Sequence, residues 1–281
     1  MENPPPHQTK IAPAGAKLFN LKSEAAKQKT DLLNPYTHNQ SSLWCGGLLK
    51  HVAIIPDGNR RWAKKRRLAP WIGHRQGAKN FEKILETARD LGIFCLTFWA
   101  GSYDNLTKRP AAEVRFLKEV YRVHFSRLLK AKEIYTDKVK VNIFGFWREL
   151  LQERIKKPME EVIEKTETHN NRFVNFLIGY NGTNEMMEAI EKIVKKCKED
   201  QALKITPQLV KENLWTRDLP PVDLVIRTGL EGDPHWSNGF MMWDTADSQF
   251  YFTETLWPDF EEKEFLKALE SYSKRERRMG A

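Results

Sequence analysis

Cysteine is scarce in this sequence of 281 residues, which contains only Cys45, Cys95 and Cys197, widely spaced. With no CxxC pair and no Cys/His cluster, the pattern argues against a disulfide framework and a structural zinc site. A reducing, cytoplasmic setting is the simplest expectation. The sequence also lacks an apolar run of about 18 residues, the minimum for a membrane-spanning helix. Its polar, proline-rich start, MENPPPHQTK, lacks the apolar core of a secretory signal.

Three common signatures of nucleotide-binding and hydrolytic enzymes are absent as well. There is no GxxxxGK[ST] segment, no GxGxxG after a strand and no GxSxG elbow. These absences argue against a P-loop enzyme, a dinucleotide-binding domain and a serine hydrolase of the usual kind.

Positive charge is in excess, with 46 Lys and Arg against 37 Asp and Glu and a formal net charge of +9. Such a surplus attracts phosphates, nucleic acid or an acidic membrane surface. The basic residues are dispersed along expected helices, apart from KKRR at 64–67 and SKRERR at 273–278. No RRM, KH or helix-turn-helix pattern is evident, so we do not expect nucleic acid as a partner.

The chain divides into an extension and one folded domain. Residues 1–44 read as a flexible, basic, proline-rich extension, with membrane or partner contact as the alternative. The domain, 45–281, alternates apolar runs with amphipathic stretches. Buried strands are expected at 51–56, 94–100, 139–145, 172–180 and 222–228, with a last strand or irregular edge at 248–257. Helices are expected at 74–92, 111–133, 149–170, 184–200, 207–215 and 261–278, with Pro158 bending or splitting the third.

This alternation predicts an α/β fold with a single open, mostly parallel sheet of about six strands surrounded by helices. The strands are nearly all apolar, as expected when both faces of a sheet are covered. In such sheets, ligands bind beyond the carboxyl ends of the strands.

Polar residues follow three of the expected strands, and arginine occurs in each group. The candidates are Asp57, Gly58, Asn59, Arg60, Arg61 and Trp62 after the first strand, Ser102, Tyr103, Asp104, Asn105, Lys108 and Arg109 after the second, and Arg227, Thr228, Gly229, His235, Ser237 and Asn238 after the fifth. The planar guanidinium group of arginine donates two parallel hydrogen bonds to phosphate oxygens, so the pattern predicts a phosphate or diphosphate ligand.

Two residues of this region leave alternatives open. Asp57 is either a helix cap or a salt-bridge partner of Arg60 or Arg61, or else a ligand of Mg²⁺, which takes few protein carboxylates and completes its shell with water and phosphate. His74 opens an expected helix, where it either meets an anion or caps the turn.

Five segments resemble the signature blocks of the cis-prenyltransferases, the undecaprenyl diphosphate synthase family. They are HVAIIPDGNRRWA, GHRQGAKN, SYDNLTKRP, DLVIRTG and YFTETLWPDF, followed by RERR, in order from about residue 50 to the end. The resemblance implies a Mg²⁺-dependent enzyme, normally a homodimer, that adds isopentenyl diphosphate in cis geometry to an allylic diphosphate such as farnesyl diphosphate. Peripheral membrane contact through the product is a further expectation.

The resemblance also implies a role for each matching residue. Asp57 would hold Mg²⁺, and Gly58, Asn59, Arg60 and Arg61 would cradle the allylic diphosphate. Asn105 would lie near the reacting carbons, and Arg227 would bind isopentenyl diphosphate. Further substrate contacts are expected from Trp62, His74, Ser102, Tyr103, Asp104, Arg109, His235, Ser237 and Asn238. An apolar tunnel for the growing chain is expected near 114–129 and 141–144, although core packing accounts for most of those side chains.

The sequence departs from the family pattern at several positions. An insertion near 232–234 replaces the usual second arginine with His235 or Trp236, and Gln249 stands where many members have a metal-binding glutamate. Pro70 replaces a diphosphate-binding arginine and Gly101 an aromatic residue; Asp233, His235, Asp244 or Asp247 are candidates to compensate. An elongating enzyme is the main interpretation. An altered, non-elongating prenyl coupling and a non-catalytic partner subunit remain the alternatives.

Overall fold

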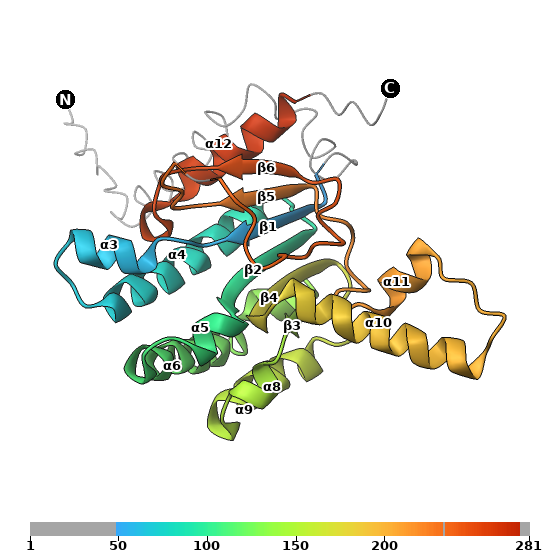
Figure 1. Cartoon of the computed structure of the whole chain (residues 1–281). Coiled ribbons are helices and arrows are strands. Elements are labelled where there is room, and N and C mark those ends of the chain that lie inside the picture. Colours follow the sequence, from blue (N-terminus) through green and yellow to red (C-terminus); the bar gives the residue numbers. More distant parts are fainter. Residues whose placement is uncertain (1–48, 233, 276–281) are drawn as a thin grey trace, which may run out of the picture.

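The computed structural model describes residues 49–232 and 234–275 (Figure 1). It contains one sheet, ordered β3-β4-β2-β1-β5-β6, in which every pair of neighbouring strands is parallel. The strands are β1 His51–Ile55, β2 Cys95–Ser102, β3 Val139–Phe144, β4 Arg172–Tyr180, β5 Leu224–Arg227 and β6 Gln249–Phe252. The predicted open parallel sheet is confirmed, and 248–257 does supply the last strand. The expected extension, 1–44, lies outside the described residues.

Helices connect the strands and flank the sheet. They are α3 Asn59–Lys65, α4 Pro70–Asp90, α5 Tyr103–Thr107, α6 Ala111–Leu128, α7 Lys132–Thr136, α8 Trp147–Leu150, α9 Glu153–Lys165, α10 Gly182–Glu199, α11 Pro207–Asn213, the short 3₁₀ helix η1 Trp257–Asp259 and α12 Glu262–Ser273. Within 49–232 and 234–275, no helix combines the length and hydropathy needed to cross a bilayer.

Both faces of the sheet are buried, which explains the unbroken apolar character of its strands. In β1, Val52 and Ile54 face the core under α4, α6, α9 and α12, whereas Ala53 and Ile55 face the opposite side. The opposite side is packed by the segment that contains Phe240 and Met241. Because side chains alternate along a strand, burying both sets requires a layer on each face of the sheet.

Two helix predictions differ from the structure. The helix expected at 111–133 ends at Leu128, and a turn at 129–131 precedes α7, whose Ile134 packs into the core. Pro158 does not split its helix, since α9 runs continuously through it. A proline near a helix start removes only one intrahelical hydrogen bond, and here the buried face of α9 is retained on both sides of it.

Candidate functional site

The carboxyl ends of β2, β1 and β5 lie side by side, because these strands are parallel neighbours. A cavity of about 730 Å³ lies at this edge. Twelve of the predicted site residues line it: Asp57, Gly58, Asn59, Arg60, Arg61, His74, Ser102, Asn105, Arg109, Arg227, Ser237 and Asn238. The sheet therefore brings together three loops that are far apart in the sequence.

Asp57 lies between two arginines from different loops. Its Oδ1 is 3.2 Å from Arg61 Nη2, and its Oδ2 is 3.5 Å from Arg227 Nη2. The N-cap of α3 is Gly58, so the cap alternative for Asp57 is wrong and the ion pair with Arg61 is present. Since the Asp57 side chain is 45% exposed, its carboxylate remains accessible from the cavity.

The backbone around Asp57 is held by a residue that was not assigned a role from the sequence. Buried Thr228 uses its hydroxyl twice: it accepts from Asp57 N at 3.0 Å and donates to Asp57 O at 3.0 Å. Gly58 has φ +105, and a Cβ there would lie 2.7 Å from Leu256. Only glycine fits such a position without strain, so the turn that presents Asp57 is fixed from both sides.

Arg227 is bound by the segment that carries the insertion. Its Nη1 donates to His235 O and, at 3.1 Å, to Ser237 Oγ, and its Nη2 is 3.1 Å from His235 Nε2. The buried Nε–H of Arg227 makes no hydrogen bond within the described part of the chain. Because an unpaired buried donor is costly, this atom is suited to receive a ligand oxygen.

Glu113 contacts three basic residues that line the cavity, Arg60, His74 and Arg109. Its Oε1 accepts from Arg109 Nη1 at 2.8 Å and from His74 Nε2 at 3.1 Å, and its Oε2 is 3.8 Å from Arg60 Nε. Burial raises the pKa of Glu113, but the hydrogen bond from His74 and the two arginines outweigh it and hold the pKa below its ordinary value. Glu113 is a positioning residue that the sequence analysis missed.

His74 is hydrogen-bonded to this acid through Nε2. Helix α4 begins at Pro70, so His74 lies inside the helix and the alternative that it caps the turn is wrong. Burial lowers its pKa, although Glu113 opposes the shift. Nε2 therefore donates to the carboxylate, and Nδ1 is left as the second nitrogen.

Seven of the predicted site residues do not line the cavity: Trp62, Tyr103, Asp104, Lys108, Thr228, Gly229 and His235. Trp62 donates to Asp259 at 2.7 Å and lies under Arg66, Tyr103 packs against Phe146, and Asp104 pairs with Lys108 at 3.1 Å. His235 does not line the cavity but contacts Arg227, which does. The predicted contacts of Trp62, Tyr103 and Asp104 with a ligand in this cavity are therefore not supported by their geometry.

Two further cations line the cavity near Pro70. Lys64 and Arg67 line it, and Arg67 adopts φ +54 at the end of α3, three residues before Pro70. The Tyr121 side chain fills the space beside Gly101. A Cβ at Gly101 would lie 2.4 Å from the Tyr121 hydroxyl, which donates to Ala100 O. The aromatic volume expected at Gly101 is thus supplied by α6.

Gln249 is not near Asp57. It is the first residue of β6 and pairs with Leu224, the first residue of β5, so it lies at the amino edge of the sheet, opposite the cavity. A glutamate at this position could not reach Asp57 within the same chain. Within a single chain, the position at which the resemblance places the family's glutamate therefore does not lie beside Asp57.

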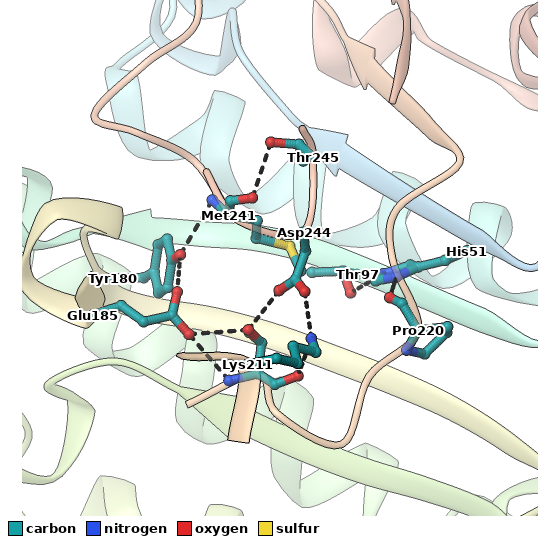
Figure 2. A network of polar contacts seen from close by, with 10 residues as sticks. His51, Thr97, Tyr180, Glu185, Lys211, Pro220, Met241, Asp244 and Thr245 are labelled. Atoms are coloured by element: carbon teal, nitrogen blue, oxygen red, sulfur yellow. Dashed lines mark hydrogen bonds and ion pairs between the residues drawn. The ribbon is translucent and has the colours of Figure 1, made fainter. Parts of the chain in front are cut away.

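Asp244 does not compensate either. It is buried and binds Lys211 and Thr216, and Thr216 also contacts Glu185, which accepts from Tyr180 (Figure 2). Asp247 is exposed and does not line the cavity, and Asp233 lies outside the described residues.

A second, apolar cavity of about 390 Å³ continues from the first. The two share Pro56, Asn59, His74, Ala100 and Leu117 as lining residues. Beyond these, the apolar cavity runs between α4, α6 and the sheet. Its walls include Phe81, Leu85, Leu117, Val120, Tyr121, Phe125, Leu128, Phe98, Val141 and Phe176. Part of α6 and Val141 thus line an apolar cavity in the region where the sequence predicts a tunnel.

The polar cavity fits a hard cation that is shared with phosphate. In the described part of the chain, no three His, Cys, Asp or Glu residues form a metal cluster. Asp57 nevertheless offers an accessible carboxylate among arginines, and Mg²⁺ commonly takes one or two protein carboxylates plus water and phosphate oxygens. The donor set is therefore compatible with Mg²⁺ only in the presence of a phosphate ligand.

Comparison with known proteins gives a consistent result. A family model described as putative undecaprenyl diphosphate synthase matches residues 55–280. A tritrans,polycis-undecaprenyl-diphosphate synthase (geranylgeranyl-diphosphate specific) of Pyrococcus abyssi is 39% identical, covering 84% of this chain and 88% of the relative. An isoprenyl transferase of Thermotoga maritima is 39% identical, covering 82% and 96%.

Two solved structures have the same fold. Lavandulyl diphosphate synthase from Lavandula x intermedia, in complex with dimethylallyl diphosphate, aligns with a TM-score of 0.77 at 31% identity, covering 83% of this chain and 99% of that one. A probable undecaprenyl diphosphate synthase from Campylobacter jejuni aligns with a TM-score of 0.66 at 27% identity, again covering 83% and 99%.

Proposed function

The chain belongs to the undecaprenyl diphosphate synthase family of isoprenyl transferases, and from that premise we propose its substrates and the roles of its residues. It joins isopentenyl diphosphate, in cis geometry, to an allylic prenyl diphosphate such as farnesyl diphosphate. The product is a polyprenyl diphosphate. One observation carries this proposal: a cavity lined by arginines opens directly into an apolar cavity, which matches a molecule with a diphosphate head and a hydrocarbon tail.

The allylic diphosphate is bound by the loop after β1. Arg60, Arg61, Lys64 and Arg67 supply cations, and the hydrocarbon tail enters the apolar cavity past His74. Guanidinium groups bind diphosphate oxygens in pairs, so the head group is held in a defined orientation. Glu113 pairs with Arg60 and Arg109 and so holds both guanidinium groups at the cavity.

Isopentenyl diphosphate is bound on the other side, by the loop after β5. Arg227 and Ser237 offer donors, including the unpaired Nε–H of Arg227. His235 holds Arg227 in place of the usual second arginine. This arrangement brings both head groups to one edge of the sheet, as a reaction between two bound substrates requires.

The reaction breaks the allylic C–O bond, and its electron pair stays on the departing diphosphate. The double bond of isopentenyl diphosphate forms the new C–C bond, and a proton leaves to restore a double bond. We assign the departing diphosphate as the proton acceptor, with Asn105 near the reacting carbons. Arginines aimed at the diphosphate stabilise the charge that develops on it, which is the main way such sites lower a barrier.

Asp57 would hold Mg²⁺ together with the diphosphate. The bound cation supplies Lewis-acid stabilisation of the departing group. Arg61 and Arg227, which now pair with Asp57, would then be available to the substrate diphosphates.

A homodimer in the cytoplasm completes the proposal. Supporting the dimer, α10 carries an exposed apolar stripe of Met187, Ile190 and Val194, with exposures of 51%, 47% and 47%. Trp243 and Phe252 are also exposed, and β6 is an open edge strand. Apolar stripes of this kind commonly mark subunit interfaces.

The test is a turnover assay with farnesyl or geranylgeranyl diphosphate, labelled isopentenyl diphosphate and Mg²⁺. We expect products of several added units and a loss of at least about 100-fold in rate for Asp57→Asn. Asp90→Asn, which changes an exposed acid paired with Arg89, is the control and should stay active. A product with one added unit would support altered coupling, and an inactive wild type would support the partner-subunit alternative.

A further inference from the structure

The turn between α3 and α4 combines four cations with two exposed apolar side chains. Residues 64–71 read KKRRLAPW, and the turn projects away from the sheet (Figure 1). Leu68 is 42% exposed and Trp71 is 45% exposed. We call residues 64–71 the basic tip.

The backbone of the basic tip is fixed. Leu68 N donates to Ala63 O at 2.9 Å and Arg67 N donates to Lys64 O at 3.0 Å, with Arg67 left-handed at φ +54. These two bonds form a Schellman-type helix end, and Pro70 begins α4 directly afterwards. The exposed side chains are therefore presented by an ordered turn, which lowers the entropy lost on docking.

The charge of the basic tip is largely uncompensated. Arg66 pairs with Asp259 at 3.1 Å, whereas Lys64, Lys65 and Arg67 form no ion pair with any residue of 49–232 and 234–275. Such a basic cluster attracts an anionic surface.

The apolar side chains indicate which anionic surface fits. Tryptophan concentrates at the interface between lipid head groups and acyl chains, and leucine contributes buried apolar area there. Basic side chains beside them are attracted to anionic lipids. Nucleic acid would use the cations but leave Leu68 exposed, and a protein partner usually covers a wider apolar patch than two side chains.

We propose that the basic tip docks this protein on an anionic lipid bilayer. Lys64, Arg67 and Leu68 also line the polar cavity, so the docked bilayer lies at its mouth. If the proposed function holds, an amphiphilic allylic diphosphate enters from the membrane surface with its head group directed toward the arginines. The docking itself does not depend on that activity.

The test measures sedimentation of the full chain with vesicles of phosphatidylcholine alone or with 30% phosphatidylserine. The variant is Lys65→Glu with Trp71→Ser, since neither residue lines the cavity. The control is Lys204→Glu with Ile205→Ser, an exposed cation and apolar residue far along the chain. Each lost cation weakens partitioning on the order of five-fold, so we expect the tip variant to bind at least about ten-fold more weakly.

The outcomes separate docking from catalysis. Support requires wild-type and control binding to anionic vesicles, weak binding to neutral ones, and normal turnover of the tip variant in detergent solution. Wild-type affinity in the tip variant, or equal binding to both vesicle types, overturns the proposal. A protein that docks as expected but shows no turnover contradicts only the proposed function.

Discussion

Glu113→Gln tests whether one buried acid organises the cation cluster of the site. The substitution keeps the shape of the side chain and one carbonyl acceptor but removes its charge. In the structure this carboxylate accepts from Arg109 at 2.8 Å and from His74 at 3.1 Å, and its side chain is 9% exposed. A hydrogen bond to a charged group contributes about 1.5–3 kcal/mol. Since the Arg109 side chain is 22% exposed, solvent screening reduces this value, and we expect a loss of about 2 kcal/mol.

That loss should lower the melting temperature by about 4–8 °C, taking about 2–4 °C per kcal/mol for a chain of this size. The control is Glu119→Gln on the same helix, whose partners Arg122 and Arg154 are solvent-exposed, so a change of about 0.5 kcal/mol or less is expected. Thermal unfolding followed by circular dichroism measures both variants.

The same substitution should raise the KM for the allylic substrate more than it lowers kcat, because Arg60 and Arg109 lose their anchor rather than their charge. The stability difference from wild type should also depend on pH. Since the pKa of Glu113 lies below its ordinary value of 4.5 in the folded protein, the contribution is complete above that value and is lost as the pH falls through the folded pKa. An unchanged melting temperature together with an unchanged KM would refute the assignment of Glu113 as a positioning residue.

Two further predictions concern buried contacts. Burial raises the pKa of Glu185, so the folded state loses stability as the pH rises through the folded pKa. At pH 8, Glu185→Gln should therefore have a higher melting temperature than wild type, whereas the exposed control Glu191→Gln should be unchanged. A lower melting temperature for Glu185→Gln would contradict this. Gly101→Ala should destabilise by about 1–3 kcal/mol, because its Cβ would lie 2.4 Å from the Tyr121 hydroxyl. Tyr121→Phe should restore part of that loss in denaturant unfolding, and no rescue would show that the clash lies elsewhere.

The sequence predicts the sheet well because each strand is an apolar run that cannot be confused with an amphipathic helix. The convergence of Asp57, Arg61 and Arg227 is also predictable, since carboxyl ends of parallel strands share one edge. This argument needs only the strand type and direction, not the order of the strands. It therefore extends to Ser102 and Asn105, which follow β2.

The features missed are those that depend on strand order or on packing between helices. Glu113 resembles any acid in the first turn of a helix, where it would stabilise the helix dipole; its contact with His74 arises only from how α4 and α6 pack. The resemblance places the family's glutamate at Gln249, but the sequence does not say that β6 is a parallel edge strand whose first residue lies at the opposite edge. The register of β6 against β5, and not the spacing of residues in the sequence, decides whether the side chain at 249 can approach Asp57.

A single acid among arginines has a purpose in the absence of substrate. Arg61 and Arg227 come from loops on different strands and would repel each other at the same edge of the sheet. Asp57 pairs with both, at 3.2 and 3.5 Å, and so holds them in place as a diphosphate would. In the proposed reaction, bound diphosphates would give the arginines better counter-anions. The Asp57 carboxylate, whose Oδ1 also accepts from Gly58 N at 2.6 Å, would then be available to a cation. Its exposure of 45% permits that exchange without unfolding the turn, which Thr228 and Gly58 keep fixed.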